Sequence, residues 1–190
     1  MFMKIAAYSY DEYVHLVKSF HGSLAPGLII GGFIVDLALK NLPEGEFFDA
    51  ICETSVCLPD AVQLLTPCTI GNGWLKIFDV GRFAVTLYEK EKGTGIRVYL
   101  DSEKLKPWTE FNAWYFKLKK KKDQDFELLM NQIKDAGPSV LSMQPVRVKP
   151  ELTVKRSLGP TAPCPGCGES YPLRDGASCL SCQGRTPYVE

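Results

Sequence analysis

The sequence predicts an α+β protein with an antiparallel-sheet core, packed helices and a small C-terminal zinc ribbon or knuckle. Apolar residues recur at helical spacing over residues 9–40, whereas three strand-like segments follow one another over residues 74–100. Helices and strands are therefore segregated along the chain, which is typical of an α+β fold. Residues 163–190 are poor in apolar side chains and contain two Cys-x2-Cys pairs, which favours a metal-held module.

The N-terminal part is predicted to form two helices. Ser9 and Glu12 fit a capping box ahead of an apolar run, and the helix that follows should end near His21. A second helix is expected to begin at Pro26 and to end at residues 41–43, where the sequence reads Asn-Leu-Pro. Its apolar residues lie on most sides, so we expect it to be buried.

The middle of the chain is predicted to supply the sheet. FFDAICETSVC (residues 47–57) indicates a strand that runs into a turn, and residues 59–66 indicate a short helix with proline in its first turn. Three further strands are expected in WLKIFD, RFAVTLYEK and GIRVYL, with turns between them at residues 80–82 and 90–95.

Two more helices and a late strand complete the predicted core. Asp101 is a candidate helix cap, DFELLMNQIKDAG predicts a helix that ends at Gly137, and VLSMQPVRV predicts a strand. We therefore expect an α+β core at residues 1–150, a polar, proline-containing linker at 151–162 and a four-cysteine zinc finger at 163–190.

Composition limits the classes of function. The chain has 190 residues, with 22 Lys and Arg against 22 Asp and Glu, so no overall basic field favours nucleic acid. It contains no apolar run long enough to span a membrane, and its first residues do not resemble a signal peptide. We expect a cytoplasmic protein whose seven cysteines are thiols or metal ligands.

The C-terminal cysteines form the strongest motif. Cys164 and Cys167 make one Cys-x2-Cys pair, Cys179 and Cys182 make the other, and eleven residues separate the pairs. Each such turn directs two thiolates at one centre, and four soft ligands in a tetrahedron suit Zn²⁺. Two disulfides, unmetallated thiols and an iron centre are the alternatives. With every position taken by protein, the zinc site would be structural and would supply most of the folding energy of this segment.

Three cysteines lie in the expected core. Cys52 falls in an apolar strand and is predicted to be a buried, inert thiol. Cys57 precedes the helix at residues 59–66, whose positive end favours a thiolate, and Cys68 follows that helix. Asp60 lies in the first helical turn, where capping is its ordinary role.

A lysine-rich run, KLKKKK at residues 117–122, follows several aromatic residues. Aromatic and basic side chains together can form a surface for single-stranded nucleic acid. A solvated helix end is the more ordinary interpretation, and the acidic DQDFE segment follows at once.

These motifs together resemble the family of the formylmethanofuran dehydrogenase E subunit. The match runs through FHGSLAPGL, then C-x2-DA-x-Q at residues 57–63, then CTIGNGWL-x3-D-x-G-R-x-A-V-T-x-Y and GIRV. The paired C-terminal cysteines match a zinc-finger extension of the family. The resemblance implies an α+β core, an intertwined homodimer and, in some members, a metal at a core site. It does not imply catalysis, because the molybdopterin and iron–sulfur chemistry of the named complex belongs to its other polypeptides.

The resemblance also assigns a possible core metal site. His21, Cys57 and Cys68 match family positions, with Asp60 nearby. Ser23 stands where a second histidine is usual, and Ala25 stands where a cysteine is usual, so the site has fewer ligands than in its relatives. Three remaining ligands would leave one open position, as catalytic zinc prefers. The alternative role for His21 is structural, at a helix end and hydrogen-bonded to the backbone.

Three hypotheses of function follow. The first is a metal-binding accessory protein, which acts in a homodimer or in a larger oxidoreductase complex. The second is a regulatory or adaptor protein whose zinc module contacts nucleic acid or a protein partner. The third is an enzyme that uses a core metal at His21 and Cys57 or Cys68. No substrate or reaction can be recognised in the sequence itself.

Overall fold

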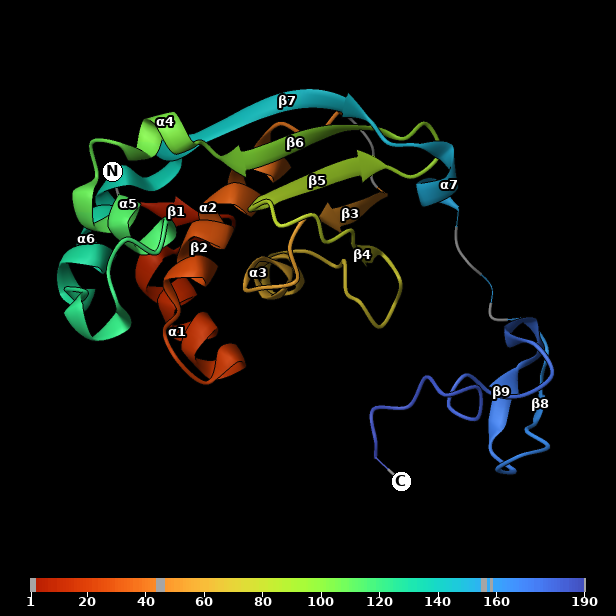
Figure 1. Ribbon diagram of the computed structural model, residues 1–190. Coiled ribbons are helices and arrows are strands. Elements are labelled where there is room, and N and C mark those ends of the chain that lie inside the picture. The colour runs from red at the N-terminus through yellow and green to blue at the C-terminus, as the bar shows by residue number, and fades with distance from the viewer. Residues whose placement is uncertain (1–2, 44–46, 155–156, 158, 190) are drawn as a thin grey trace. The chain divides into compact units, whose positions relative to one another are not determined.

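The computed structural model describes the chain except residues 1–2, 44–46, 155–156, 158 and 190 (Figure 1). The chain forms two compact units, Met1–Thr153 and Val154–Glu190. The first unit contains a five-stranded sheet with packed helices, and the second contains a two-stranded sheet and the four C-terminal cysteines. The predicted α+β fold class is confirmed.

The first predicted helix is α1 (Tyr10–His21), which follows a short antiparallel pair, β1 (Lys4–Ile5) and β2 (Tyr8–Ser9). The Ser9 hydroxyl accepts a hydrogen bond from the N–H of Glu12, and the Glu12 carboxylate accepts one from the N–H of Ser9, as the capping box predicts. Gly22 ends the helix in the left-handed conformation, at φ 79°.

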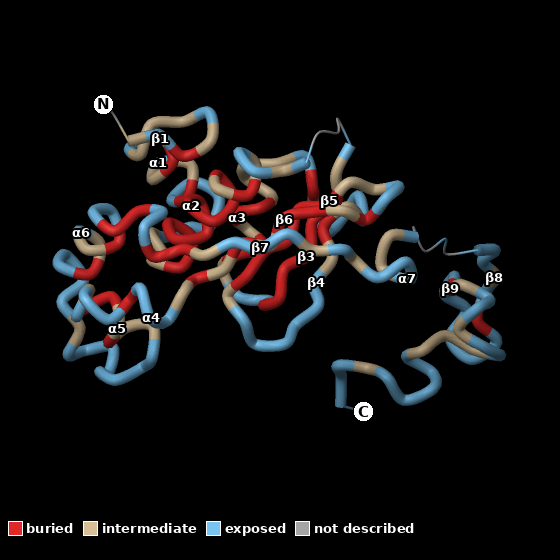
Figure 2. Tube along the Cα trace, turned by 90° about the horizontal axis from the view of Figure 1, so that it is seen from above, coloured by how far each residue is buried: buried red, intermediate tan, exposed pale blue. Residues whose placement is uncertain are grey.

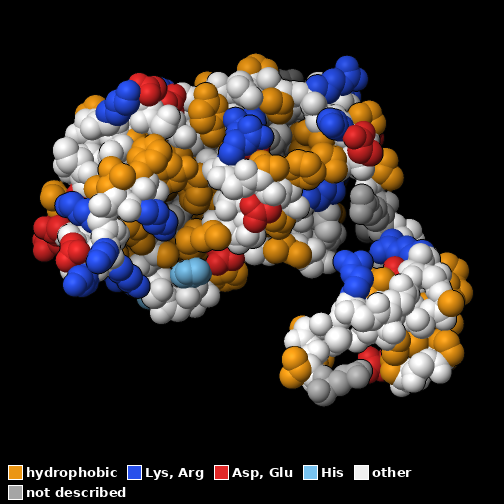
Figure 3. Space-filling model, viewed as in Figure 1, with side chains coloured by type: hydrophobic (Ala, Val, Ile, Leu, Met, Phe, Trp, Pro, Cys, Tyr) orange, Lys and Arg blue, Asp and Glu red, His pale blue; other side chains and the backbone are white. Residues whose placement is uncertain are grey.

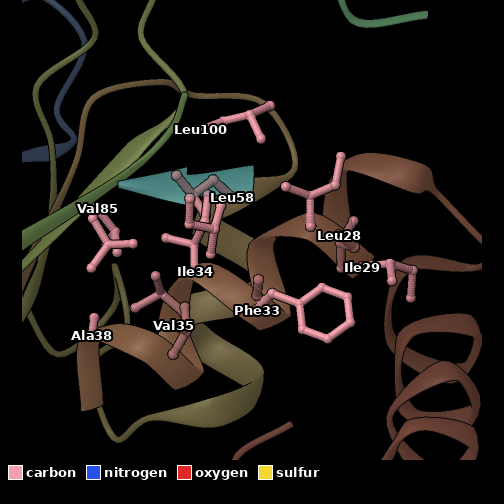
Figure 4. Packing of buried hydrophobic residues seen from close by; sticks show 14 of the residues in the cluster. Leu28, Ile29, Phe33, Ile34, Val35, Ala38, Leu58, Val85 and Leu100 are labelled. Carbon is pink, nitrogen blue, oxygen red and sulfur yellow. The ribbon is translucent and has the colours of Figure 1, made fainter. Parts of the chain in front are cut away.

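The second predicted helix, α2 (Pro26–Lys40), is the centre of the core. Glycines on this helix let neighbours approach closely. A Cβ atom at Gly32 would lie 2.4 Å from the ring of Tyr13 on α1, and one at Gly31 would lie 2.7 Å from the Cβ of Ala61. Figure 4 shows how the α2 side chains, among them Leu28 and Ile34, pack in the buried cluster.

The sheet has the strand order β4-β3-β5-β6-β7. Its strands are β3 (Phe48–Cys52), β4 (Leu75–Ile77), β5 (Ala84–Glu89), β6 (Thr94–Leu100) and β7 (Leu141–Arg147). Neighbouring strands are antiparallel except β3 and β4, because α3 (Leu58–Leu65) returns the chain to the end of the sheet at which β3 begins. The turn at residues 80–82 therefore does not join neighbouring strands, since β3 lies between β4 and β5.

The two faces of the sheet differ in chemistry. One face packs on α2 through apolar residues such as Val85 and Val98, and buried segments concentrate there (Figure 2). The other face carries buried carboxylates with basic partners. Glu53 binds Arg97 at 2.5 and 2.8 Å, and Asp49 accepts from Lys76 at 2.9 Å. These ion pairs offset the free energy of desolvation that each buried charge would otherwise cost.

Helices α4 (Ser102–Leu105), α5 (Thr109–Tyr115) and α6 (Phe126–Ala136) lie together at one end of the sheet (Figure 1). Asp101 caps α4 as predicted, although that helix has only one turn. The buried Glu110 holds the connection between α5 and α6, since it accepts from the N–H of Asp125 and pairs with Lys119. Short 3-10 turns, η1 (Lys121–Asp123) and η2 (Gly137–Val140), flank α6, which ends at Gly137 as expected.

The C-terminal unit contains β8 (Thr161–Pro163), β9 (Ser170–Pro172) and the 3-10 turn η3 (Leu173–Asp175). Among its described residues, only Cys164 and Tyr171 are buried hydrophobic residues. Part of the expected linker at 151–162 forms α7 (Pro150–Thr153), and residues 155, 156 and 158 of it lie outside the described residues. None of the helices in the described part of the chain has the length and apolar character needed to cross a bilayer.

Candidate metal centres

The four C-terminal cysteines converge on one point. The sulfur atoms of Cys164, Cys167, Cys179 and Cys182 all lie within 4.8 Å of one another, and those of Cys167 and Cys179 are 3.7 Å apart. Zn–S bonds of about 2.3 Å in a tetrahedron place the sulfurs about 3.8 Å apart, whereas a disulfide needs about 2.0 Å. The arrangement therefore fits a tetrahedral zinc ion and not a pair of disulfides.

Backbone N–H groups donate to two of these sulfur atoms and favour the thiolate of Cys164. The N–H of Cys179 donates to the sulfur of Cys164 at 3.3 Å, and the N–H of Cys182 donates to that of Cys179 at 3.4 Å. Backbone donors, that of Cys179 first, lower the pKa of Cys164 to about 6. A Cβ atom at Gly166 would lie only 3.0 Å from the sulfur of Cys182, so glycine leaves room for that ligand. Deprotonated sulfur is the form that binds zinc.

Cys68, a predicted ligand of the core metal site, lies in the hydrophobic core. Its side chain is fully buried and its sulfur donates to the carbonyl of Phe48 at 3.5 Å. Burial raises its pKa to about 11, and that of the neighbouring Cys52 to about 12. Cys52 is thus a buried thiol, as expected, and Cys68 shares that environment. The end of α3 thus directs Cys68 into the core, and its role as a metal ligand together with His21 stays a prediction.

His21 and Asp60 form a pair between two helices. The Nδ1 atom of His21, at the end of α1, lies 2.8 Å from a carboxylate oxygen of Asp60, in the first turn of α3. Both side chains are about one-third exposed, at 32% and 31%. The alternative prediction for His21 was a hydrogen bond to the backbone. In the structure its partner is instead the side chain of Asp60. Asp60 likewise binds histidine and makes no capping bond to its own helix.

Cys57 lies beside this pair, at a strained turn. It has φ 58° and ψ −50°, and the N–H of Leu58 donates to the carbonyl of Val56 at 2.6 Å. These values describe a γ-turn of the rare form in which the central residue has positive φ. The Cys57 side chain is half-buried, and burial, followed by the Asp60 carboxylate, raises its pKa.

The structure thus brings His21, Asp60 and Cys57 to one region and leaves Cys68 in the core. In the described residues, only the C-terminal cysteines are close enough together to hold an ion as they stand. Ser23 and Ala25 add no strong ligand, as the sequence already indicated.

Sequence reasoning missed two neighbours of Cys57. Its sulfur lies 3.0 Å from the position that a Cβ atom on Gly27 would occupy, and the positive charge of Lys117 opposes the rise in its pKa. Lys117 begins the lysine run for which a solvated helix end is the ordinary interpretation. No signal in the sequence connects residues 57 and 117, since only the packing of α5 brings them together.

Comparison with known proteins identifies the family. A family model described as "FmdE, Molybdenum formylmethanofuran dehydrogenase operon" matches residues 20–149. A second model, described as an FmdE treble clef zinc finger, matches residues 155–189. The model thus gives the type of zinc finger as a treble clef, whereas the cysteine spacing predicted a ribbon or knuckle.

A solved structure extends this likeness to the whole chain. It is the crystal structure of a tungsten formylmethanofuran dehydrogenase FmdE-like protein from Syntrophus aciditrophicus, which is 53% identical in sequence, with a TM-score of 0.91. The alignment covers 100% of both chains.

A curated relative shares only part of its length. It is described as a probable S-adenosyl-L-methionine-binding protein from Archaeoglobus fulgidus, and it is 28% identical over 196 residues. The match covers 88% of this chain and 51% of the relative, so the chain spans about half of that protein. From these comparisons and the four-cysteine cluster, we conclude that the chain belongs to the FmdE family and carries its treble clef zinc finger.

Proposed function

We propose that this protein is an accessory member of the FmdE family, with a C-terminal zinc that is structural and not catalytic. The observation that carries the proposal is the closed set of four sulfurs at tetrahedral spacing. Four protein ligands leave no position for a substrate or an activated water, which catalytic zinc requires. The family description, which refers to a formylmethanofuran dehydrogenase operon, supports a role beside other proteins.

Metal analysis of the purified protein tests this proposal. We expect the C-terminal cysteines to bind one zinc per chain, lost in Cys164→Ser because three thiolates bind zinc far less tightly than four. Cys57→Ser is the matched control, since it also removes one thiol and should retain the zinc. Zinc that persists at one per chain in Cys164→Ser would contradict the structural site.

A core ligand site is the second candidate function. The pairing of His21 with Asp60 at 2.8 Å, beside the half-buried Cys57, favours it. A metal bound there would have His21, Cys57 and Asp60 as candidate ligands, which suit Zn²⁺ and similar ions. A core metal would add a second metal per chain to the zinc of the finger, and this second metal would be lost in His21→Ala and retained in Cys68→Ala. A content of one metal in the wild type, all of it in the finger, would exclude this core metal.

We further propose that the protein forms a homodimer in the cytoplasm. The family resemblance implies the dimer, and exposed apolar residues support it. Val56, Phe78 and Val80 are 63%, 54% and 46% exposed on neighbouring loops that the Ser55–Asp79 hydrogen bond joins. Light scattering should give twice the chain mass, and Phe78→Ser should shift it toward the monomer. A monomeric wild type would contradict the dimer.

A further inference from the structure

Helix α7 is the last element of the core unit, and it lies on the sheet without burying any of its residues. The hydroxyl of the buried Tyr88, on β5, donates to the Leu152 carbonyl at 3.2 Å. Among the described residues, this is the one side-chain hydrogen bond that joins α7 to the sheet. Basic and acidic side chains, and not an apolar surface, lie together at α7 (Figure 3). An element that buries so little apolar surface belongs to the least stable part of a structure.

The Tyr88 hydroxyl belongs to a cluster of charged side chains on the face of the sheet opposite α2. Lys76 donates to this hydroxyl at 2.7 Å and to one carboxylate oxygen of Asp49 at 2.9 Å. The Lys90 ammonium lies 3.3 Å from the other oxygen of Asp49. Asp49 is only 5% exposed, so water has little access to these groups. The hydrogen bonds of the hydroxyl are therefore made mainly with protein atoms.

The single hydrogen of the Tyr88 hydroxyl has two acceptors within reach. The Leu152 carbonyl lies at 3.2 Å, and a carboxylate oxygen of Asp49 lies at 3.5 Å. One hydroxyl donates one hydrogen, so the nearer acceptor, on α7, receives it while α7 is docked. If α7 leaves the sheet, the hydroxyl can donate to Asp49, and no buried donor loses its partner. The cluster thus has two arrangements in which this hydroxyl is satisfied.

We propose that α7 is a reversible latch, which is docked when Tyr88 donates to Leu152 and released when Tyr88 donates to Asp49. With the latch docked, the chain leaves the core unit after Thr153. With the latch released, it leaves after Val148, whose N–H donates to the Gly93 carbonyl at 2.8 Å. Release adds residues 149–153, about 17 Å of extended chain, to the connection between the two units. The latch thus gives the zinc unit two lengths of connection to the core, a property beyond the proposed function.

A protease that cleaves after glutamate measures the released population. Glu151 lies in α7, and the peptide bond that follows it must leave the helix before it can be cleaved. Where the rate is proportional to protease concentration, cleavage after Glu151 in the zinc-loaded protein reports the population of the released latch. Mass spectrometry identifies the fragment 152–190. Cleavage after Glu53, which is 8% exposed, reports unfolding of the whole core unit in the same sample.

Two variants of the cluster should change this rate in opposite directions. Tyr88→Phe removes the donor that docks the latch and should raise cleavage after Glu151 about three- to tenfold, the effect of one hydrogen bond. Asp49→Asn weakens the acceptor of the released state, because an amide oxygen accepts less strongly than a carboxylate, and should lower the rate about two- to fivefold.

Tyr99→Phe is the matched control, because Tyr99 lies on the same face of the sheet as Tyr88. In the part of the chain that the structure describes, its hydroxyl makes no hydrogen bond to α7. This variant should leave cleavage after Glu151 unchanged.

The directions of these changes decide whether α7 is such a latch. An unchanged rate in Tyr88→Phe would overturn the proposal, since the hydroxyl would not hold α7. A faster rate in Asp49→Asn would also overturn it, because Asp49 would then support the docked state. If cleavage after Glu53 rises by the same factor as cleavage after Glu151, α7 opens only when the whole core unfolds and the proposal is wrong.

Discussion

The backbone conformation at position 117 is unfavourable for the residue that occupies it. The left-handed conformation at the end of α5 suits glycine, yet the residue is lysine, whose Cβ atom is disfavoured there. Lys117→Gly should therefore stabilise the core unit by about 1 kcal/mol, because the relief of strain exceeds the added entropy of the unfolded chain. Urea unfolding followed by fluorescence measures this change.

Lys120 supplies the matched control. It lies in the same loop but has φ −67° and ψ 150°, an ordinary extended conformation. Lys120→Gly should destabilise the core unit by about 0.5–1 kcal/mol. If Lys117→Gly is the more damaging of the two, the backbone at 117 is not strained.

The Glu53–Arg97 pair should make stability depend on pH. The hydrogen bond from Arg97 lowers the pKa of Glu53 below its usual value. A carboxyl group whose pKa is depressed by folding contributes stability above its unfolded pKa of about 4.3, and this is lost as the pH falls through the lower folded value. Glu53→Gln should cost about 3 kcal/mol at pH 7, since it leaves Arg97 unpaired in the sheet, and less below pH 4.

Unfolding curves at pH 7 and pH 3.5 check this prediction. Glu103→Gln is the control, because Glu103 and its partner Lys106 are 74% and 66% exposed. That exposed pair should contribute less than about 1 kcal/mol at either pH. A Glu53→Gln penalty that is equal at both pH values would show that the charge on Glu53 is not what stabilises the sheet.

The role of a residue could be predicted where its partners lie close by in the sequence. Ser9 and Glu12 act through neighbours within four residues, so their capping box could be read directly from the sequence. The roles of Cys68 and Lys117 could not, because each depends on segments that are distant along the chain. His21 was predicted to be a possible metal ligand, but its pairing with Asp60 could not be predicted because it requires the packing of α1 against α3.

Close packing between α1 and α2 depends on Gly32. Alanine at an internal helical position is favoured over glycine by about 1 kcal/mol in isolation. A Cβ atom at Gly32 would, however, lie 2.4 Å from the buried Tyr13 ring, whose hydroxyl donates to the carbonyl of Leu28 at 2.9 Å. Gly32→Ala should therefore destabilise the core unit by about 1–3 kcal/mol despite its better helix propensity.

Thermal unfolding of Gly32→Ala and Gly71→Ala tests this account. Gly71 has no atom nearer than 4.0 Å to the position of a new Cβ atom, so its replacement should be nearly neutral. An increase in the melting temperature of Gly32→Ala would mean that α1 moves aside without cost.

Elements with strong start and stop signals were predicted well. Helices α1, α2, α3 and α6 lie close to their expected bounds, since capping residues, proline and glycine mark their ends. The position of β4 was not predictable, because periodicity identifies a strand but not its neighbour. The parallel pairing of β3 with β4 follows from where α3 returns the chain, which is a property of the whole sheet.

Zinc removal should unfold the C-terminal unit and leave the stability of the core unit unchanged. The C-terminal unit buries few apolar side chains, so the metal must supply most of its stability. A chelator should unfold residues 161–186 and leave the urea midpoint of the core unit unchanged. Hydrogen exchange by mass spectrometry should show loss of protection in that segment only. A lower core midpoint after chelation would show that the finger stabilises the core.

At the scale of the whole molecule, the sequence predicted the fold class and the four-cysteine cluster. The spacing of the cysteines is a local signal, and two Cys-x2-Cys turns are enough to predict the zinc site. The region around Cys57 depends on α1, α3, α5 and the loop before β5, so no local pattern encodes it.

The strand order also has a consequence for folding kinetics. Strands β5 and β6 pair through a hairpin turn whose Gly93 N–H donates to the carbonyl of Glu89, whereas β7 joins β6 only after forty intervening residues, 101–140. Short loops close first because their entropy cost is smaller. During synthesis the hairpin can therefore form while β7 is still absent, and β6 remains an open edge until residue 147 leaves the ribosome. The order of appearance along the chain thus sets the period in which this sheet is most exposed to wrong pairing.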